Sequence, residues 1–182
     1  IGEAMIRLCP ELLRSFRVAA VDSYSDMLRE TMRSVAPTRA GGGVPVCVVL
    51  TPGHFNSAYY EHSFLADTMG VELVESGDLV FDDNVVYMQT IAGRVKVDVI
   101  YRRIDDDFLD PLVFRPDSLL GVPGIISAYR AGNVALINAP GNGIDDDKAI
   151  YSYMPEIVKF YSGSEAKLPN VETWRCRAPE AQ

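Results

Sequence analysis

Polar side chains that could bind a small molecule follow each of four apolar segments of this sequence. After one segment stand Arg102 and Arg103, and a planar guanidinium at the end of a buried strand can hold a carboxylate or a phosphate through two hydrogen bonds. Solvent exposure explains polar residues in any single loop, but it explains an arginine pair less well. The candidate residues, in chain order, are His54, Asn56, Ser57, Tyr60, Glu61, Glu75, Ser76, Asp78, Arg102, Arg103, Asp105, Asp106, Asp107, Asn138, Gly141, Asn142, Asp145 and Lys148.

Metal binding and covalent catalysis are less well supported by the residue spacing. The carboxylates of Asp105–Asp107 could hold Mg²⁺, but three adjacent ones cannot all face one ion, and a solvated turn explains them at least as well. His54 and His62 show no His-x-x-x-His spacing. Ser57 lacks the Gly-x-Ser-x-Gly elbow of hydrolases, and Cys47 falls inside an apolar run. We therefore expect no metal ligand and no catalytic nucleophile in this chain.

The apolar segments themselves predict an α/β fold. Val44–Leu50 is β-branched and apolar on both faces, as a central parallel strand must be. A helix over Ser57–Met69 with Gly70 at its C′ position and a strand over Val71–Val74 complete a β-α-β unit. In such sheets ligands bind beyond the carboxyl ends of the strands, so the polar residues above lie where a site would form.

Further segments extend this pattern to a Rossmann-like, mostly parallel sheet of about four to five strands flanked by helices. An acidic turn at Asp82–Asn84 predicts a small antiparallel hairpin as an insertion. NAD-type binding is not expected, because Gly41–Gly43 precedes the first strand, whereas phosphate-binding glycines must follow it. An N-terminal helical segment is predicted with helices over Glu3–Phe16 and Asp22–Val35, the second of which has Ser23 and Asp26 as a capping box. The other predicted elements are a third strand over Val95–Tyr101, a helix over Ile125–Arg130, a fourth strand over Val134–Asn138 and a helix over Asp147–Tyr161. Pro155 is expected to kink or divide the last helix.

Composition and charge limit the function classes. The net charge of −8 over 182 residues disfavours nucleic acid as a partner. The longest apolar run is far shorter than the roughly 20 residues that cross a bilayer, so we expect no membrane span. The three cysteines never form a Cys-x-x-Cys pair, which is typical of a reducing compartment and predicts a cytoplasmic protein. The start at Ile1 without an initiator Met suggests a part of a longer protein.

Four segments of the chain closely resemble the bacterial circularly permuted ATP-grasp proteins, which are related to eukaryotic glutathione synthetase and to glutathionylspermidine synthetase. The resemblance runs from Pro45 to Arg177, and its most specific motif is Tyr-Arg-Arg-Ile-Asp-Asp-Asp at Tyr101–Asp107. The segments that carry it are Leu50–His62, Val97–Leu112, Asp145–Tyr151 and Leu168–Val171.

The resemblance implies roles for particular residues. The loop His54–Tyr60 is similar to the peptide-substrate loop of eukaryotic glutathione synthetase, and Tyr101–Arg103 to its substrate-gripping arginine segment, with Arg103 favoured over Arg102 as the clamp. His54 and Tyr60 stand where that enzyme has an acidic residue and an amide, so the substrate need not be the same peptide. The implied substrate-binding residues are His54, Asn56, Ser57, Tyr60, Arg102, Arg103 and Asp105. Asp147 and Lys148 resemble the start of the ATP-grasp domain, whose lysine reaches the nucleotide phosphates.

The activity implied is that of an ATP-dependent carboxylate–amine ligase acting through an acylphosphate. Its partners would be a small carboxylate or peptide and an amine, and further copies of the chain in a homo-oligomer are possible partners. ATP and Mg²⁺ would serve the full-length protein, with none bound to this part alone, because the Mg²⁺-binding Glu-Asp-Asn segment is expected upstream and a second nucleotide lysine downstream. The expected domains are a helical linker segment (1–40), a Rossmann-like substrate-binding domain (41–140) and the start of the ATP-grasp domain (141–182). The alternative functions are a non-catalytic carboxylate- or partner-binding module and, less favoured, a Rossmann-like hydrolase or transferase.

Overall fold

The computed structural model describes residues 2–16, 21–38 and 42–175. The chain divides into two compact units, Ile1–Asn138 and Ala139–Gln182. Within the described residues, no helix is both long and apolar enough to cross a membrane.

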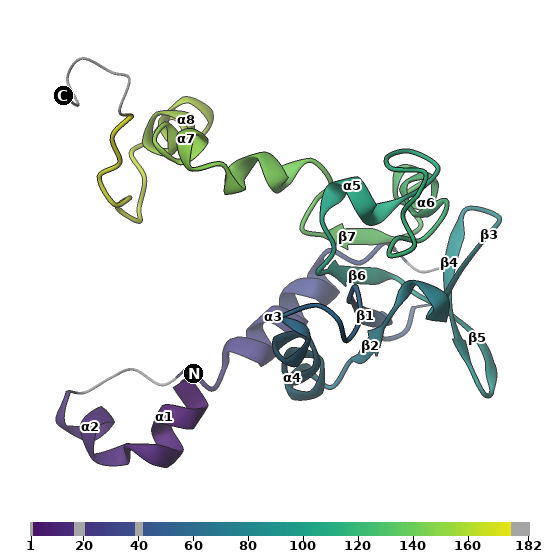
Figure 1. Ribbon diagram of the computed structural model, residues 1–182, viewed down its shortest axis with the longest axis horizontal. Helices are drawn as coiled ribbons and strands as arrows, with labels where there is room; N and C mark the ends of the chain where they lie inside the picture. The colour runs from purple at the N-terminus through teal and green to yellow at the C-terminus, as the bar shows by residue number, and fades with distance from the viewer. Residues whose placement is uncertain (1, 17–20, 39–41, 176–182) are drawn as a thin grey trace. The chain divides into compact units, whose positions relative to one another are not determined.

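A parallel sheet forms the centre of the first unit (Figure 1). Its four strands within the described residues are β1 (Cys47–Leu50), β2 (Glu72–Val74), β6 (Val99–Arg102) and β7 (Ala135–Ile137). Their order is β2-β1-β6-β7, and each neighbouring pair is parallel. The prediction of a Rossmann-like parallel sheet is confirmed.

Both faces of this sheet are covered, as the unbroken apolar character of β1 requires. Val48 and Leu50 belong to one core and Cys47 and Val49 to the other, because successive side chains of a strand point to opposite faces. The second core is completed by α3 (Tyr24–Ser34) and α4 (Tyr59–Met69), whose inward residues include Met32, Ala66 and Met69. Helices α5 (Asp106–Leu109) and α6 (Ile125–Arg130) supply residues to the first core, and Figure 1 shows the two helix pairs on opposite sides of the sheet.

A separate antiparallel sheet lies beside the first core. It consists of β3 (Leu79–Asp82), β4 (Val85–Thr90) and β5 (Gly93–Lys96), in that order. The predicted hairpin is present, with Asp83 and Asn84 at positive φ in its turn, and a third strand extends it. The predicted strand over Val95–Tyr101 is wrong, because Val95 and Lys96 end β5 of this sheet, whereas Val99 begins β6 (Val99–Arg102) of the parallel sheet.

Asp98 marks the point at which the chain passes from one sheet to the other. Its carboxylate is fully buried and accepts a hydrogen bond from the backbone N–H of Val46 at 2.8 Å, with Lys96 Nζ 3.7 Å away. The same contact explains why β1 begins at Cys47 rather than at Val44: Val46 gives its N–H to a side chain, and Pro45 has none to give.

The helix boundaries also differ from the prediction for local reasons. The first predicted helix is two helices, α1 (Gly2–Leu8) and α2 (Pro10–Ser15), with Pro10 in the first turn of the second, where a missing N–H does no harm. The capping box of α3 is not formed, since the Ser23 hydroxyl faces the Met27 sulfur and Asp26 pairs with Arg29. Helix α4 does end at Gly70 in a left-handed conformation, as predicted.

The second unit contains short helices joined by local contacts. These are η2 (Asn142–Asp146), a 3₁₀ helix, then α7 (Lys148–Tyr151) and α8 (Met154–Ser162). The single helix expected over Asp147–Tyr161 is therefore divided, and Pro155 lies in the first turn of α8. None of its described residues, 139–175, is buried.

Candidate functional site

The strand order of the parallel sheet reverses between β1 and β6. From β1 the chain passes to β2 on one side, and from β6 it passes to β7 on the other. Such a reversal leaves a crevice at the carboxyl ends of the two central strands, and this is where open α/β sheets bind ligands. The residues that emerge there are Thr51–Gly53 after β1 and Arg103 after β6, held by backbone bonds from Thr51 N to Val74 O (2.9 Å) and from Arg103 N to Leu50 O (2.8 Å).

Arg102 is buried and uses its guanidinium to hold the protein together. Its Nε donates to Asn138 O at 2.7 Å, its Nη1 donates to Ile104 O at 2.8 Å, and its Nη2 lies 2.8 Å from an Asp106 carboxylate oxygen. These contacts tie the end of β6 to the end of β7 and to the first turn of α5. They engage all three guanidinium nitrogens within the fold.

Arg103 points to the other face of the sheet, as strand alternation predicts. Its side chain is exposed, and its Nη1 lies 3.5 Å from the Tyr101 hydroxyl, at the limit of a hydrogen bond. The guanidinium carbon lies 6.0 Å from the centroid of the Tyr101 ring. Among the residues that the structure describes, no carboxylate forms a salt bridge with Arg103. Arg103 is thus the arginine of the pair whose charge remains available to a ligand.

A buried relay links α4 to the loop after β1. His62, only 2% exposed, has its Nδ1 at 2.8 Å from the Thr51 hydroxyl oxygen, which in turn accepts the backbone N–H of Gly53 at 3.3 Å. Burial, and next the positive charge of Arg103, lower the pKa of His62, with Glu61 acting weakly in the opposite direction. When a neutral His62 carries its proton on Nε2, Nδ1 accepts a hydrogen bond from the Thr51 hydroxyl, whose lone pair then faces the Gly53 N–H.

Sequence reasoning missed this structural role of His62, which it considered only as a metal ligand. A signal was present, because His62, Ala66 and Met69 follow helical spacing and all three are buried. A histidine on the inward face of a helix needs a hydrogen-bond partner, and the adjacent strand end supplies Thr51.

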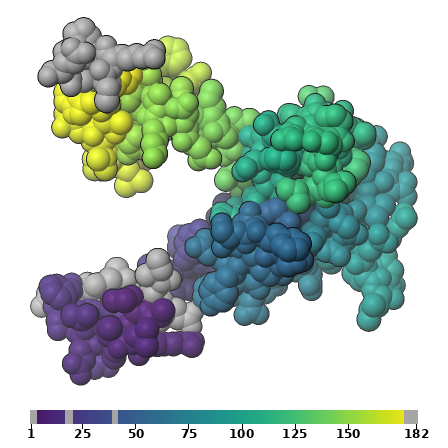
Figure 2. Space-filling model, viewed as in Figure 1, coloured from purple at the N-terminus to yellow at the C-terminus, as the bar shows by residue number. Residues whose placement is uncertain are grey.

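The predicted substrate loop is exposed. His54, Phe55, Asn56 and Ser57 are all accessible, with the rings of His54 and Phe55 4.0 Å apart. Asn56 accepts the N–H of Ala58 at 2.9 Å, which begins α4 at Tyr59 rather than at Ser57. In the space-filling view, this loop and the start of α4 lie in the dark blue region that faces the viewer (Figure 2). Tyr60 is 77% exposed and stacks on Phe64 with a centroid distance of 6.2 Å.

Glu75, at the end of β2, leans over the loop after β1. A Cβ added to Gly53 would lie 3.1–3.2 Å from the Glu75 carboxyl group, and Gly53 has φ +99°, which L side chains rarely adopt. The backbone N–H of Glu75 donates to the Asp78 carboxylate at 2.8 Å, which fixes the start of the 3₁₀ turn η1 (Ser76–Asp78). Glycine at position 53 therefore permits a close approach between a charged side chain and the loop backbone.

The acidic run after β6 does not converge on one point. Asp105 is exposed at the N-cap of α5, whereas Asp106 pairs with Arg102. Within the described part of the chain, no three His, Cys, Asp or Glu side chains are grouped so that they could hold a metal ion. Cys47 is buried in the sheet, and burial raises the pKa of its thiol, which disfavours a nucleophilic thiolate.

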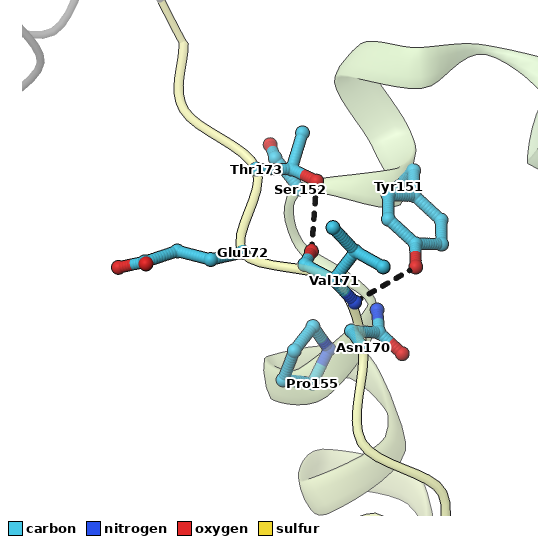
Figure 3. Close-up of a pocket in the computed structure, with 7 residues that line it drawn as sticks. All are labelled: Tyr151, Ser152, Pro155, Asn170, Val171, Glu172 and Thr173. Carbon is cyan, nitrogen blue, oxygen red and sulfur yellow. Dashed lines mark hydrogen bonds between the residues drawn. The ribbon is translucent and has the colours of Figure 1, made fainter.

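The two predicted nucleotide-binding residues lie in the second unit. The Asp147 carboxylate accepts the N–H of Ala149 at 2.7 Å and caps α7. Lys148 is exposed, and no described carboxylate forms a salt bridge with it. An open pocket of about 240 Å³ lies in the same unit (Figure 3), lined by Tyr151, Ser152, Pro155, Asn170, Val171, Glu172 and Thr173. The predicted residues are not among those that line it.

Known proteins similar to this chain were identified by comparison of sequences. The chain is 55% identical over 167 residues to an uncharacterized protein of Synechocystis sp., covering 92% of this chain and 34% of that protein. It is 55% identical over 172 residues to an uncharacterized protein of Mycobacterium tuberculosis, covering 94% and 31%. It is 43% identical over 171 residues to a Frankia alni protein named "Putative glutamate--cysteine ligase 2-3", covering 94% and 20%. The chain spans about a third of the length of the first two relatives.

The model of one protein family matches almost the whole chain. The match covers residues 2–182, and the family is described as a circularly permuted ATPgrasp. The chain belongs to the circularly permuted ATP-grasp family.

Proposed function

We propose that this chain is the substrate-binding portion of an ATP-dependent carboxylate–amine ligase. In such a reaction the γ-phosphoryl group of ATP passes to a carboxylate oxygen, giving ADP and an acylphosphate. An amine then attacks the acyl carbon, phosphate leaves, and the amine loses a proton as the amide forms. Family membership and the name of the Frankia alni relative support a ligase-type activity, and the chemistry of the strand ends supports a carboxylate substrate.

The observation that carries the proposal is the contrast between the two adjacent arginines. Arg102 is committed to Asn138, Ile104 and Asp106, whereas Arg103 emerges beside the strand-order reversal without a carboxylate partner among the described residues. A guanidinium with this freedom can bind a carboxylate through two parallel hydrogen bonds. Orientation of that carboxylate by Arg103, next to the loop of His54, Asn56, Ser57 and Tyr60, would be the contribution of the first unit to catalysis.

The second unit would contribute one contact to the nucleotide. Lys148 is exposed at the first turn of α7 and has no salt bridge to a described residue, so it fits a contact with an ATP phosphate. The described residues do not fit a Mg²⁺ site, because their carboxylates do not converge, and we derive no step through that ion. On this proposal residues 41–140 bind the substrate and residues 141–182 begin the ATP-grasp domain. Free Cys9 and Cys47 suit a cytoplasmic location.

The proposal is tested with a full-length protein that contains this sequence. ADP release that requires both a carboxylate and an amine, with the amide identified by mass spectrometry, is the expected result. Arg103→Ala should lower kcat/KM by about 10- to 100-fold, the range expected for a charged hydrogen-bonding contact. Arg130→Ala, which removes an exposed arginine at the end of α6, is the matched control. Carboxylate binding without turnover would favour a non-catalytic module, and ADP release that is independent of any carboxylate would contradict a carboxylate substrate.

A further inference from the structure

The carboxyl edge of the parallel sheet presents two opposite charges on either side of β1. In the sheet register, Val74 and Arg102 both pair with Leu50. The next residues of the three strands, Glu75, Thr51 and Arg103, therefore emerge at one level. Neighbouring strands lie about 4.8 Å apart, which puts the backbones of Glu75 and Arg103 about 10 Å from each other.

Both charged side chains lie near the same loop. Thr51 bonds to His62 of α4, and the Arg103 guanidinium lies 6.0 Å from the ring centroid of Tyr101, which belongs to the core that α4 completes, so both belong to the α4 side of the sheet. The Glu75 carboxyl group lies 3.1–3.2 Å from the point at which a Gly53 side chain would begin. The backbone of Gly53, which carries no side chain, therefore lies against the Glu75 carboxyl group and is held by its hydrogen bond to Thr51.

Neither charge is paired with an opposite charge among the described residues, although the Glu75 side chain accepts the backbone N–H of Asp78 in the capping box that begins η1. Within the described ranges, Glu75 and Arg103 form no salt bridge with each other or with any other residue. Elsewhere in the unit, opposite charges close enough to pair do so, as in Arg94–Asp82 at 3.0 Å and Arg115–Asp117 at 2.7 Å. The two separated charges at the reversal point match a ligand that carries a cation at one end and an anion at the other.

We propose that Glu75 is a specificity-determining residue of this site, and that the edge of β2, β1 and β6 binds an amino acid with a free ammonium and a free carboxylate group. The carboxylate binds Arg103, and the ammonium donates to the Glu75 carboxylate across Gly53. This inference rests on the proposed function, since it names the substrate class of the same site. The proposed function itself requires only that Arg103 bind a carboxylate.

The experiment uses three small probes that differ in charge. Glycine carries both groups, N-acetylglycine lacks the ammonium, and glycinamide lacks the carboxylate. Dissociation constants are measured by NMR titration of the 182-residue protein. We expect glycine to bind at least about tenfold more tightly than either analogue, because each missing charge removes a charge-assisted hydrogen bond.

Two variants test which residue binds each charged group of the ligand. Glu75→Gln should weaken glycine binding about tenfold while leaving N-acetylglycine unchanged, so that the two bind alike. Arg103→Gln should reduce glycine to the level of glycinamide. Glu72→Gln is the matched control, because it makes the same charge change on an exposed residue of the same strand and should leave all three affinities unaltered.

Several results would overturn the inference. If Glu75→Gln preserves the preference for glycine over N-acetylglycine, Glu75 does not bind the ammonium. If it weakens N-acetylglycine equally, Glu75 acts on the loop rather than on the ligand. If no probe binds, the edge is not an amino-acid site. In the first two cases, a loss of N-acetylglycine binding in Arg103→Gln would still support Arg103 as the residue that binds the carboxylate. The amide-forming assay tests the proposed function independently.

Discussion

The two compact units differ in what holds them together. The first has an apolar core on each face of its sheet, with fully buried side chains such as Ile100 and Met32. The second has no buried side chain among its described residues, and Phe160 and Tyr161 are about four-fifths exposed. Its contacts lie at exposed positions, such as the Tyr151 hydroxyl that accepts the N–H of Val171 at 3.2 Å.

This difference bears on how each unit can support a site. In the first unit, residues from separate strands and from α4 are fixed by long-range contacts before any ligand arrives, and such preorganisation lowers the cost of binding. In the second, the position of Lys148 depends on the short helix α7 and its Asp147 cap. If the proposed function holds, the first unit would bind its ligand at the edge of a sheet with a packed core, and the second would contribute a charge on a short helix.

The largest expected difference between the two units appears when one large apolar residue in each unit is replaced by alanine. Ile100→Ala should lower the free energy of unfolding by about 2–5 kcal/mol, because Ile100 is fully buried in the central strand β6. Phe160→Ala should change it by less than about 0.5 kcal/mol, because Phe160 is 80% exposed. Urea unfolding measures both, followed by far-ultraviolet circular dichroism for Ile100→Ala and by the fluorescence of Trp174, which lies in the second unit, for Phe160→Ala. A loss above about 1 kcal/mol in Phe160→Ala would show that the second unit has a cooperative core.

Fluorescence of Trp174 sharpens the same comparison. It is the single tryptophan of the sequence and lies in the second unit, where it is 57% exposed. Its signal reports that unit, whereas circular dichroism is dominated by the first. Ile100→Ala should therefore shift the dichroism transition and leave the fluorescence transition in place. Equal shifts of both signals would mean that the two units unfold as one.

A smaller effect on the free energy of unfolding is expected when the pH is changed, and it concerns the first unit, which contains His62. Burial lowers the pKa of His62 in the folded protein, so the unfolded chain binds more protons near and below its ordinary value of about 6.5. The contribution of neutral His62 to stability is therefore present above about pH 6.5 and is lost as the pH falls through the folded pKa. The limiting slope for one proton is about 1.4 kcal/mol per pH unit.

His62→Gln should remove this part of the pH dependence, measured as the free energy of unfolding between pH 5 and 8. The control is His54→Gln, which changes an exposed histidine of the neighbouring loop and should retain the slope. If the His62 variant keeps the full slope, another group is responsible and the buried relay through Thr51 does not depend on a neutral imidazole.

The parts of the fold that the sequence predicted are those set by local chemistry. The β-branched run of β1, Gly70 after α4 and Pro155 at the start of α8 act within a few residues of themselves. The passage from β5 to β6 was not predicted, because the alternating apolar residues Val95, Val97 and Val99 look the same whether they belong to one strand or two. The side chain that separates the two sheets is Asp98, whose partner Val46 lies 52 residues away in the chain.

The candidate site, too, was predictable from the sequence only where local chemistry decides the structure. That Arg102 and Arg103 face opposite sides of the sheet followed from strand alternation, and it is confirmed by their contacts. Arg102 is the arginine that faces the interior, because it contacts Asn138 and Asp106. Asp106 is near Arg102 in the chain, but Asn138 is 36 residues away. The approach of Glu75 to Gly53 joins two loops and has no local signature. The binding roles of all these residues remain predictions.

The smallest expected effect concerns Lys148 in the second unit. In a full-length protein, Lys148→Ala should weaken ATP binding by about 1 kcal/mol, roughly fivefold, because an exposed ammonium interacts with a phosphate through water-screened charge. Lys167→Ala, which removes another exposed lysine of the unit, is the control. Calorimetric titration with ATP measures both, and the urea midpoint of the first unit should be unchanged in either variant. An affinity equal to that of the wild type in Lys148→Ala would make Lys148 an ordinary surface lysine. A loss of a hundredfold would contradict the contrast drawn above, since it would require Lys148 to be held as rigidly as Arg102 is in the first unit.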